Sequence, residues 1–236
     1  MAIPTFVNAG TFVAAASGSI SPGLPAGWAV DDIHILVMES RSNESGQSLP
    51  TGYSHVSGSS IGTPTTPGTR LHVAWRRAQS GDAAPSITIL ANHLTARIFG
   101  FRGCVTTGDP WDVTATGTND TSSSGSKSIP GATTTVADTL VAAIIASGAD
   151  VTSSTEFSAW ANADLAAVTE RGDDMSLSGG GGGTGLATGE KATAGTYAAT
   201  TVTVVSAERH AFLSIALKPP PGGLPWRSPY PQLLAH

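Results

Sequence analysis

The sequence predicts an all-β protein: a jelly-roll-like β-sandwich made of two similar halves, followed by a proline-rich C-terminal arm. Short apolar or alternating runs are separated by clusters of Gly, Pro, Ser and Thr, the pattern of strands joined by turns. Only residues 157–165 are compatible with a helix, of one or two turns. Many short strands with almost no helix favour two packed sheets.

A second observation is that the chain repeats one pattern. Residues 24–40 run from a Pro/Gly turn through Asp32 into an apolar strand. Residues 129–147 give the same order, with Asp138 in the place of Asp32. A repeat this long does not fit a solenoid, whose units are about 20–50 residues. It fits two half-sandwiches that complete one core.

The repeat continues downstream, because each unit ends in an alternating apolar strand closed by a basic residue. That residue is Arg102 in the first unit and Lys218 in the second. The expected organisation is one sandwich domain at 1–219, with a first half at about 20–103, a Thr/Ser/Gly linker at 114–128 and a second half at about 129–218, and then the arm at 220–236.

The individual strands follow from local patterns. Apolar alternation or β-branched residues mark each one, and the turn residues between them set their limits. We expect the cores of the halves to depend on 71–75 and 99–101, and on 140–145 and 213–217. The full set of expected strands is 5–16, 33–38, 52–56, 71–76, 87–90, 96–101, 140–146, 167–170, 186–191, 200–205 and 211–217.

Composition limits the function classes. Only 12% of the 236 residues are charged, against the usual ~25%, and the net charge is −5. Scattered basic residues and a negative balance argue against nucleic acid binding. The single cysteine, Cys104, excludes an intrachain disulfide and is expected to be a buried, inert thiol. We expect neither a signal peptide nor a membrane span.

The sequence contains no catalytic or metal-binding motif that we recognise. The six histidines are isolated from one another; His34 is expected to be a satisfied structural residue, and His72 to point outward. Asp31, Asp32 and Asp138 precede the repeated strands. They could supply calcium-binding loops, but bonding to backbone amides in turns is the favoured interpretation. We therefore expect no cofactor, no bound metal and no catalytic residue.

Three further features have competing interpretations. The glycines at 179–183 suggest a phosphate cradle, but no helix or P-loop lysine follows, so a flexible surface loop is favoured. Glu170, Asp173 and Asp174 are the only crowded acids that a polysaccharide-cleaving enzyme could use. The tryptophans could build a sugar platform, although packing is the default for Trp28, Trp75, Trp111 and Trp160.

Several stretches resemble a group of tailed-bacteriophage proteins. They are the opening MAIPTFV, RIFGFRG followed by GDPWDVT, IPGATTTVADTLV, and FSAWANADLAAVTER followed by KATAGTYAATTVTV and SIALKP. Members of that group are mostly labelled hypothetical, or as virion or tail-region structural proteins. The resemblance covers most of residues 1–219 and implies a virion role. Its motifs are fold motifs, so it supplies no active-site residue.

These observations together predict a non-enzymatic structural protein of a tailed-phage virion, either a surface appendage of the tail or a capsid decoration. It would be made in the host cytoplasm and would contact tail, portal or capsid subunits and copies of itself, but neither nucleic acid nor membrane. The alternative is a carbohydrate-binding module that recognises a glycan on the host surface. A polysaccharide-cleaving enzyme is the third hypothesis.

The C-terminal arm is the expected docking element. Residues 219–236 contain six prolines, which favour an extended polyproline conformation and lower the entropy lost on binding. Trp226, Tyr230, Leu233 and Leu234 would be its apolar anchors on a partner subunit. The alternative is that the arm folds back and covers an edge of its own sandwich.

Overall fold

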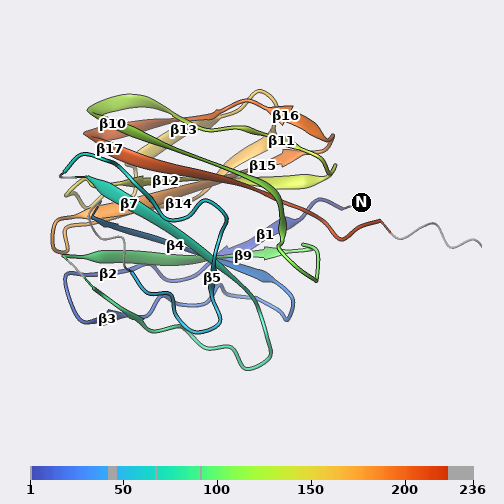
Figure 1. Cartoon of the computed structure of the whole chain (residues 1–236), viewed down its shortest axis with the longest axis horizontal. Helices are drawn as coiled ribbons and strands as arrows, with labels where there is room; N and C mark the ends of the chain where they lie inside the picture. Colours follow the sequence, from blue (N-terminus) through green and yellow to red (C-terminus); the bar gives the residue numbers. More distant parts are fainter. Residues whose placement is uncertain (1, 42–46, 67, 91, 223–236) are drawn as a thin grey trace, which may run out of the picture.

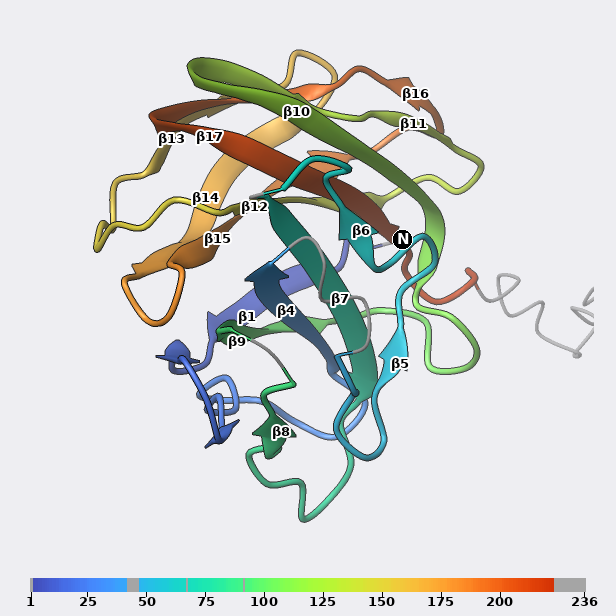
Figure 2. The ribbon, with the colours of Figure 1, turned by 60° about the vertical axis from the view of Figure 1, so that its left-hand side comes forward.

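A computed structural model describes residues 2–41, 47–66, 68–90 and 92–222, and these residues form an all-β structure without a helix. Two large antiparallel sheets lie one above the other (Figures 1 and 2). The predicted all-β class and its two packed sheets are therefore confirmed. No helix in the described ranges is long and apolar enough to cross a membrane.

The first sheet is built from the N-terminal part of the chain. Its strands are, in spatial order, β1 (Thr5–Ala9), β9 (Leu94–Arg102), β4 (Ile33–Arg41), β7 (Thr69–Arg77) and β5 (Ser54–His55), with β2 (Val13–Ala15) beside β9 and β6 (Ile61–Gly62) beside β7.

The second sheet is built from the C-terminal part. Its strands are, in spatial order, β10 (Trp111–Ile129), β17 (Thr200–Leu217), β12 (Thr139–Ser147), β15 (Gly182–Lys191) and β14 (Ala166–Ser176), with β13 (Phe157–Ala161) beside β17. Two small ribbons accompany the sheets: β3 (Ser19–Ile20) pairs with β8 (Ile87–Thr88), and β11 (Ala132–Thr134) pairs with β16 (Gly195–Tyr197).

The two sheets have the same strand order. If the five main strands of each sheet are numbered in chain order, the spatial order in both sheets is first, fifth, second, fourth, third. The small ribbons also correspond, since each pairs the strand before the second main strand with the strand before the fifth. The chain completes one sheet before it begins the other. Successive strands therefore do not alternate between sheets, and the jelly-roll topology is not confirmed.

The packing fixes which residues are equivalent. Ile33 and Leu140 both begin the inward-facing rows of β4 and β12. Two residues before each is an aspartate with positive φ: 70° at Asp31 and 59° at Asp138. The counterpart of Asp138 is therefore Asp31, not Asp32 as the sequence suggested. A shift of one residue matters because it exchanges the two faces of a strand.

The expected boundaries of the halves need correction at two places. β1 occupies in the first sheet the position that β10 occupies in the second, and both strands have an irregular register at their start, after Phe6 and after Trp111. The first unit therefore includes β1. The expected linker at 114–128 lies inside β10, which pairs with β17 as a long ribbon. Its Thr-rich composition suits a strand whose faces are largely exposed.

The central core lies between the sheets and continues on their outer faces. Phe99, Phe101 and Leu213 are among the residues buried between the sheets. A second cluster covers the outer face of the first sheet, and others cover that of the second. All nine residues of β12 are buried for this reason. Strands covered on both faces give continuous apolar runs rather than alternation.

Outer-face packing also explains an error about His72. The side chain points away from the central core, as expected, but it is buried, and its Nε2 lies 3.0 Å from Ser40 Oγ. His34 is buried against Trp28, with ring centroids 5.7 Å apart, and neither ring nitrogen has a hydrogen-bond partner in the described structure. The expectation that His34 is satisfied was wrong.

Residues 157–165 do not form the expected helix. Phe157–Ala161 is β13, which pairs with β17, and the buried Phe157 ring joins an outer cluster. Helix-tolerant alanines do not decide the outcome here, because β13 contributes pairing and aromatic burial.

Cys104 is buried as expected, and burial raises the pKa of its thiol to about 12. Trp226, Tyr230, Leu233 and Leu234 lie outside the described residues.

Candidate functional site

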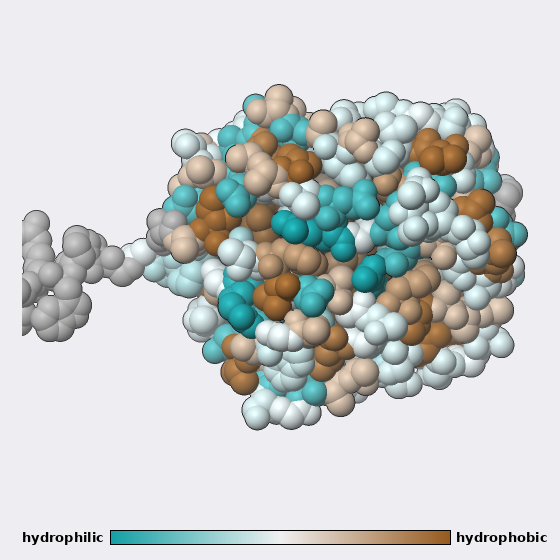
Figure 3. Space-filling model, turned by 180° about the vertical axis from the view of Figure 1, so that it is seen from behind, coloured by the Kyte–Doolittle hydropathy of each residue, from teal (hydrophilic) through white to brown (hydrophobic). Residues whose placement is uncertain are grey.

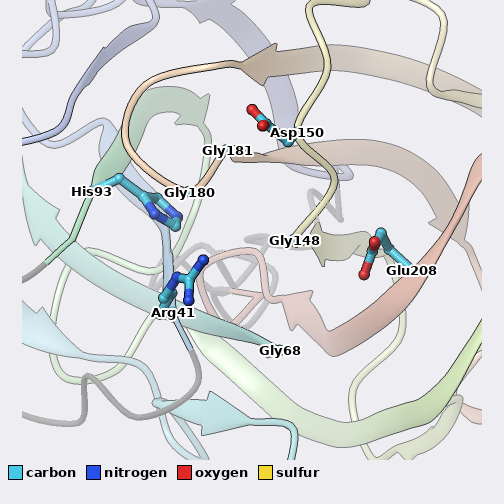
Figure 4. A pocket seen from close by; sticks show the side chains of 8 residues that line it. All are labelled: Arg41, Gly68, His93, Gly148, Asp150, Gly180, Gly181 and Glu208. Carbon is cyan, nitrogen blue, oxygen red and sulfur yellow. The ribbon is translucent and has the colours of Figure 1, made fainter. Parts of the chain in front are cut away.

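A polar pocket of about 160 Å³ lies at the end of the sandwich opposite the point where β17 ends. It is drawn in Figure 4, and both sheets contribute to its walls. The lining residues are Arg41, Gly68, His93, Gly148, Asp150, Gly180, Gly181 and Glu208.

The pocket lies on the seam between the two sheets. Arg41 ends β4, and Gly148 directly follows β12, the equivalent strand of the second sheet. Gly68 directly precedes β7, and Gly181 directly precedes β15, which is again the equivalent strand. The matching strand order therefore brings corresponding strand ends together around one hollow.

A buried acid and histidine support one wall of the pocket. Glu39 and His93 are almost fully buried, and Glu39 Oε2 lies 3.0 Å from His93 Nε2. Thr69 Oγ1 donates to the other carboxylate oxygen at 3.0 Å, and Asn92 Oδ1 lies 3.2 Å from His93 Nδ1. The His93 ring therefore has a hydrogen-bonding neighbour at each of its two nitrogens. The pair fixes the ring against the pocket.

The glycine run closes over this pair. A Cβ on Gly182 would lie 2.0 Å from Glu39 Oε2, and a Cβ on Gly181 would lie 2.3 Å from Asp150 Cα. Both residues also have positive φ, 150° and 70°. Backbone this close to other groups requires glycine. The expectation of a flexible surface loop was wrong for this part of the run, because residues 181–183 are buried and lead into β15.

Charges of opposite sign occupy opposite sides of the pocket. Arg41 and His93 lie on one side, and Asp150 and Glu208 lie on the other (Figure 4). The glycines between them place backbone, not side chains, at the surface of the hollow. The site can thus supply hydrogen-bond donors from one wall and acceptors from the other.

The aspartates that begin the repeated strands have structural roles. Asp32 is buried and accepts two hydrogen bonds from Arg102, at 2.9 and 2.7 Å, and one from Ala29 N at 2.8 Å. Asp31 N donates to Ala78 O, and Asp138 N donates to Ala192 O, so each residue anchors a strand start. In the described ranges, no three His, Cys, Asp or Glu side chains gather closely enough to hold a metal ion.

The crowded acids of β14 have different partners rather than a common cleft. Glu170 accepts from Trp160 Nε1 at 2.9 Å, and Asp174 pairs with Arg97 of the other sheet at 2.6 Å. Asp173 is buried and accepts from Phe157 N at 2.8 Å. Burial raises the pKa of Asp173 to about 7, which that hydrogen bond partly opposes. The three carboxylates thus lie on one strand, β14, and each has a different partner.

One tryptophan borders a surface hollow. Trp75 packs edge to face on Trp111, with centroids 5.5 Å apart, and is only partly buried. A hollow of about 250 Å³ beside it is lined by Gly52, Ser54, Trp75, Arg76, Arg77 and Gln79. The sequence assigned Trp75 to packing alone, whereas the structure places it both in packing and at a surface hollow.

Sequence reasoning did not single out the charged residues of the seam pocket. Arg41, Asp150 and Glu208 are far apart in the chain, and neither they nor Glu39 behind the wall belong to a spacing motif. Two signals were present: an acid at the end of an apolar strand, and a glycine run, which indicates close approach of backbone. Neither signal says which segments meet.

The comparisons with known proteins give no further assignment. No protein-family model, no curated protein and no solved structure matches the chain.

Proposed function

We propose that the protein is a non-enzymatic structural subunit of a tailed-phage virion, a surface appendage of the tail or a capsid decoration, which docks through its C-terminal arm. The observation that carries the proposal is where the chain leaves the sandwich. Lys218 is still part of the fold: its N–H donates to Pro110 O at 2.9 Å, and its carbonyl accepts from Val105 N at 3.0 Å. Residues 219–222 then help to line two apolar hollows at that end.

Those hollows supply the apolar surface that the proposal needs. One, of about 420 Å³, includes Val105, Val136 and Pro219, and another, of about 390 Å³, includes Ala2 and Pro221. On the face drawn in Figure 3, by contrast, hydrophobic residues form small groups separated by polar ones. Apolar surface beside the start of an apolar, proline-rich sequence supports attachment at this end.

Truncation after Gly222 tests the proposal. The shortened protein keeps the hydrogen bonds of Lys218 and should melt within about 2 °C of the full chain. It should fail to enter virions assembled in its presence. A matched full-length variant with Trp226, Tyr230, Leu233 and Leu234 changed to Ser separates loss of apolar anchors from loss of length. Normal occupancy of particles by both variants would contradict docking through the arm.

The hollow beside Trp75 favours a second candidate function, recognition of a host glycan. An indole supplies a flat apolar surface for a sugar ring, and Arg76, Gln79 and Ser54 supply hydrogen-bonding groups. Trp75→Ala should abolish binding on a glycan array, and Trp160→Ala, which alters an indole on another part of the molecule, should not. Absence of glycan binding by the intact protein would reject this candidate while leaving the structural role untouched.

A further inference from the structure

We propose that the seam pocket binds a small zwitterion, a molecule that carries a carboxylate and an ammonium group a few bonds apart. The proposal goes beyond the structural role and does not depend on it. It rests on three properties of the pocket: the distribution of charge, the rigidity of the walls and the size of the hollow.

The charge distribution selects a ligand with both signs. The planar guanidinium of Arg41 matches a carboxylate, which it can bind through two parallel hydrogen bonds. Asp150 and Glu208, on the opposite side, can accept hydrogen bonds from an ammonium group (Figure 4). A purely anionic ligand would face these two acids, and a purely cationic ligand would face Arg41. Like charges placed together disfavour both.

The walls are held in place before any ligand arrives. The His93 ring is fixed by Glu39, which is itself held by Thr69. Gly181 is held by its backbone, because its N–H donates to Ser178 O at 3.2 Å and a Cβ there would lie 2.3 Å from Asp150 Cα. Groups held by buried neighbours lose little entropy on binding, so a small ligand can gain measurable affinity.

The size of the hollow limits the ligand. Its volume of about 160 Å³ is close to that of an engineered cavity of about 150 Å³ that holds benzene, a molecule of six heavy atoms. A zwitterion of about seven heavy atoms, such as 4-aminobutanoate, has a suitable size on that comparison. A hexose, with about twice as many heavy atoms as benzene, is too large to be enclosed.

The test uses the full chain, labelled with ¹⁵N, and three probes of similar length: 4-aminobutanoate, butanoate and butylamine. Amide shifts of Gly68, Gly148, Gly180 and Gly181 report on the pocket. We expect the zwitterion to shift them at a concentration about tenfold lower than either single-charge probe needs. Glu208→Gln should raise the concentration required by about tenfold, since one acceptor loses its charge.

A matched control is Glu190→Gln, which changes an exposed acid of the same sheet at the other end of β15 and should leave the titration unchanged. Asp150→Asn tests the second acid of the pocket independently. Because Asp150 is exposed, this change does not endanger the folding of the protein. Equal binding of butanoate would show an anion site, and equal binding of butylamine a cation site; either result overturns the proposal. If none of the three probes shifts the glycine amides, the lining charges interact only with one another, and this result also overturns the proposal.

Discussion

At the scale of single residues, the central core predicts the largest losses of stability. Phe101 is fully buried between the sheets and packs edge to face on Phe6, with centroids 5.8 Å apart. Phe101→Ala should lower the free energy of unfolding by about 3–5 kcal/mol. Urea denaturation measures this, with Val205→Ala, at a side chain that is 65% exposed, as the control. Trp75→Ala should cost less than Phe101→Ala, because Trp75 is only partly buried.

Gly182 makes a second prediction at this scale. Gly182→Ala would place a methyl group 2.0 Å from Glu39 Oε2 and would impose an unfavourable φ of 150° on a residue with a side chain. The melting temperature should fall by several degrees. In the Glu39→Ala background the added loss should be smaller, because the clash is gone and only the backbone strain remains. Strict additivity of the two losses would show that Gly182 does not pack on Glu39.

At the scale of elements, the structure changes the expected effect of proline in β10. In a linker at 114–128 proline would be tolerated, but in a strand it removes a ladder hydrogen bond when its N–H faces the partner. β10 is an edge strand paired with β17, so successive N–H groups alternate between β17 and the outside.

Of Ala115→Pro and Thr116→Pro, one should therefore lower the free energy of unfolding by about 3 kcal/mol or more, and the other by much less. Each variant is the control for the other. If chemical denaturation shows both variants to be as stable as the parent protein, residues 114–128 are a linker and not a strand.

At the scale of the whole molecule, buried histidines predict how stability depends on pH. Burial lowers the pKa of His34, and lowers the pKa values of His72 and His210 to about 3, from the ordinary value of 6.5. Below pH 6.5 the unfolded chain therefore binds protons that the folded chain does not. Stability should fall as the pH is lowered from 6.5 towards 3, by up to about 1.4 kcal/mol per pH unit for each of His72 and His210, and His34 acts in the same direction.

Two carboxyl groups oppose this trend, because burial raises the pKa values of both Asp173 and Asp174. The pKa of Asp173 is raised to about 7, so the folded chain binds the extra proton between about pH 4 and 7, and that contribution to stability is lost as the pH rises. Below pH 6, His72 and His210 together outweigh Asp173, while His34 acts with the histidines and Asp174 acts against them. Urea midpoints at pH 7 and pH 5 should therefore differ in favour of pH 7, and His210→Phe should reduce the difference. A higher midpoint at pH 5 would contradict the buried neutral histidines.

The amino-acid sequence by itself determined the all-β class, the burial of Cys104 and a repeated pattern ahead of two equivalent strands. These properties follow from alternation, turn residues and spacing, which act locally along the chain. Where local preference was weak, the prediction from sequence was wrong. The alanines at 159–163 are compatible with a helix, and the Thr-rich segment 114–128 is compatible with a loop. Both segments are strands in the structure, because each pairs with β17.

Only the tertiary structure decided which faces are covered and which distant residues meet. Asp31, not Asp32, is the counterpart of Asp138, and this could be recognised only from which residues of β4 and β12 face the central core. Neighbouring residues of a strand face opposite sides, so a shift of one residue exchanges the two faces. The pocket of Arg41, His93, Asp150 and Glu208 required both sheets to end at one seam. No local pattern predicts that these four residues are neighbours, because they lie on separate strands and connections. The packing of one sheet on the other brings them together.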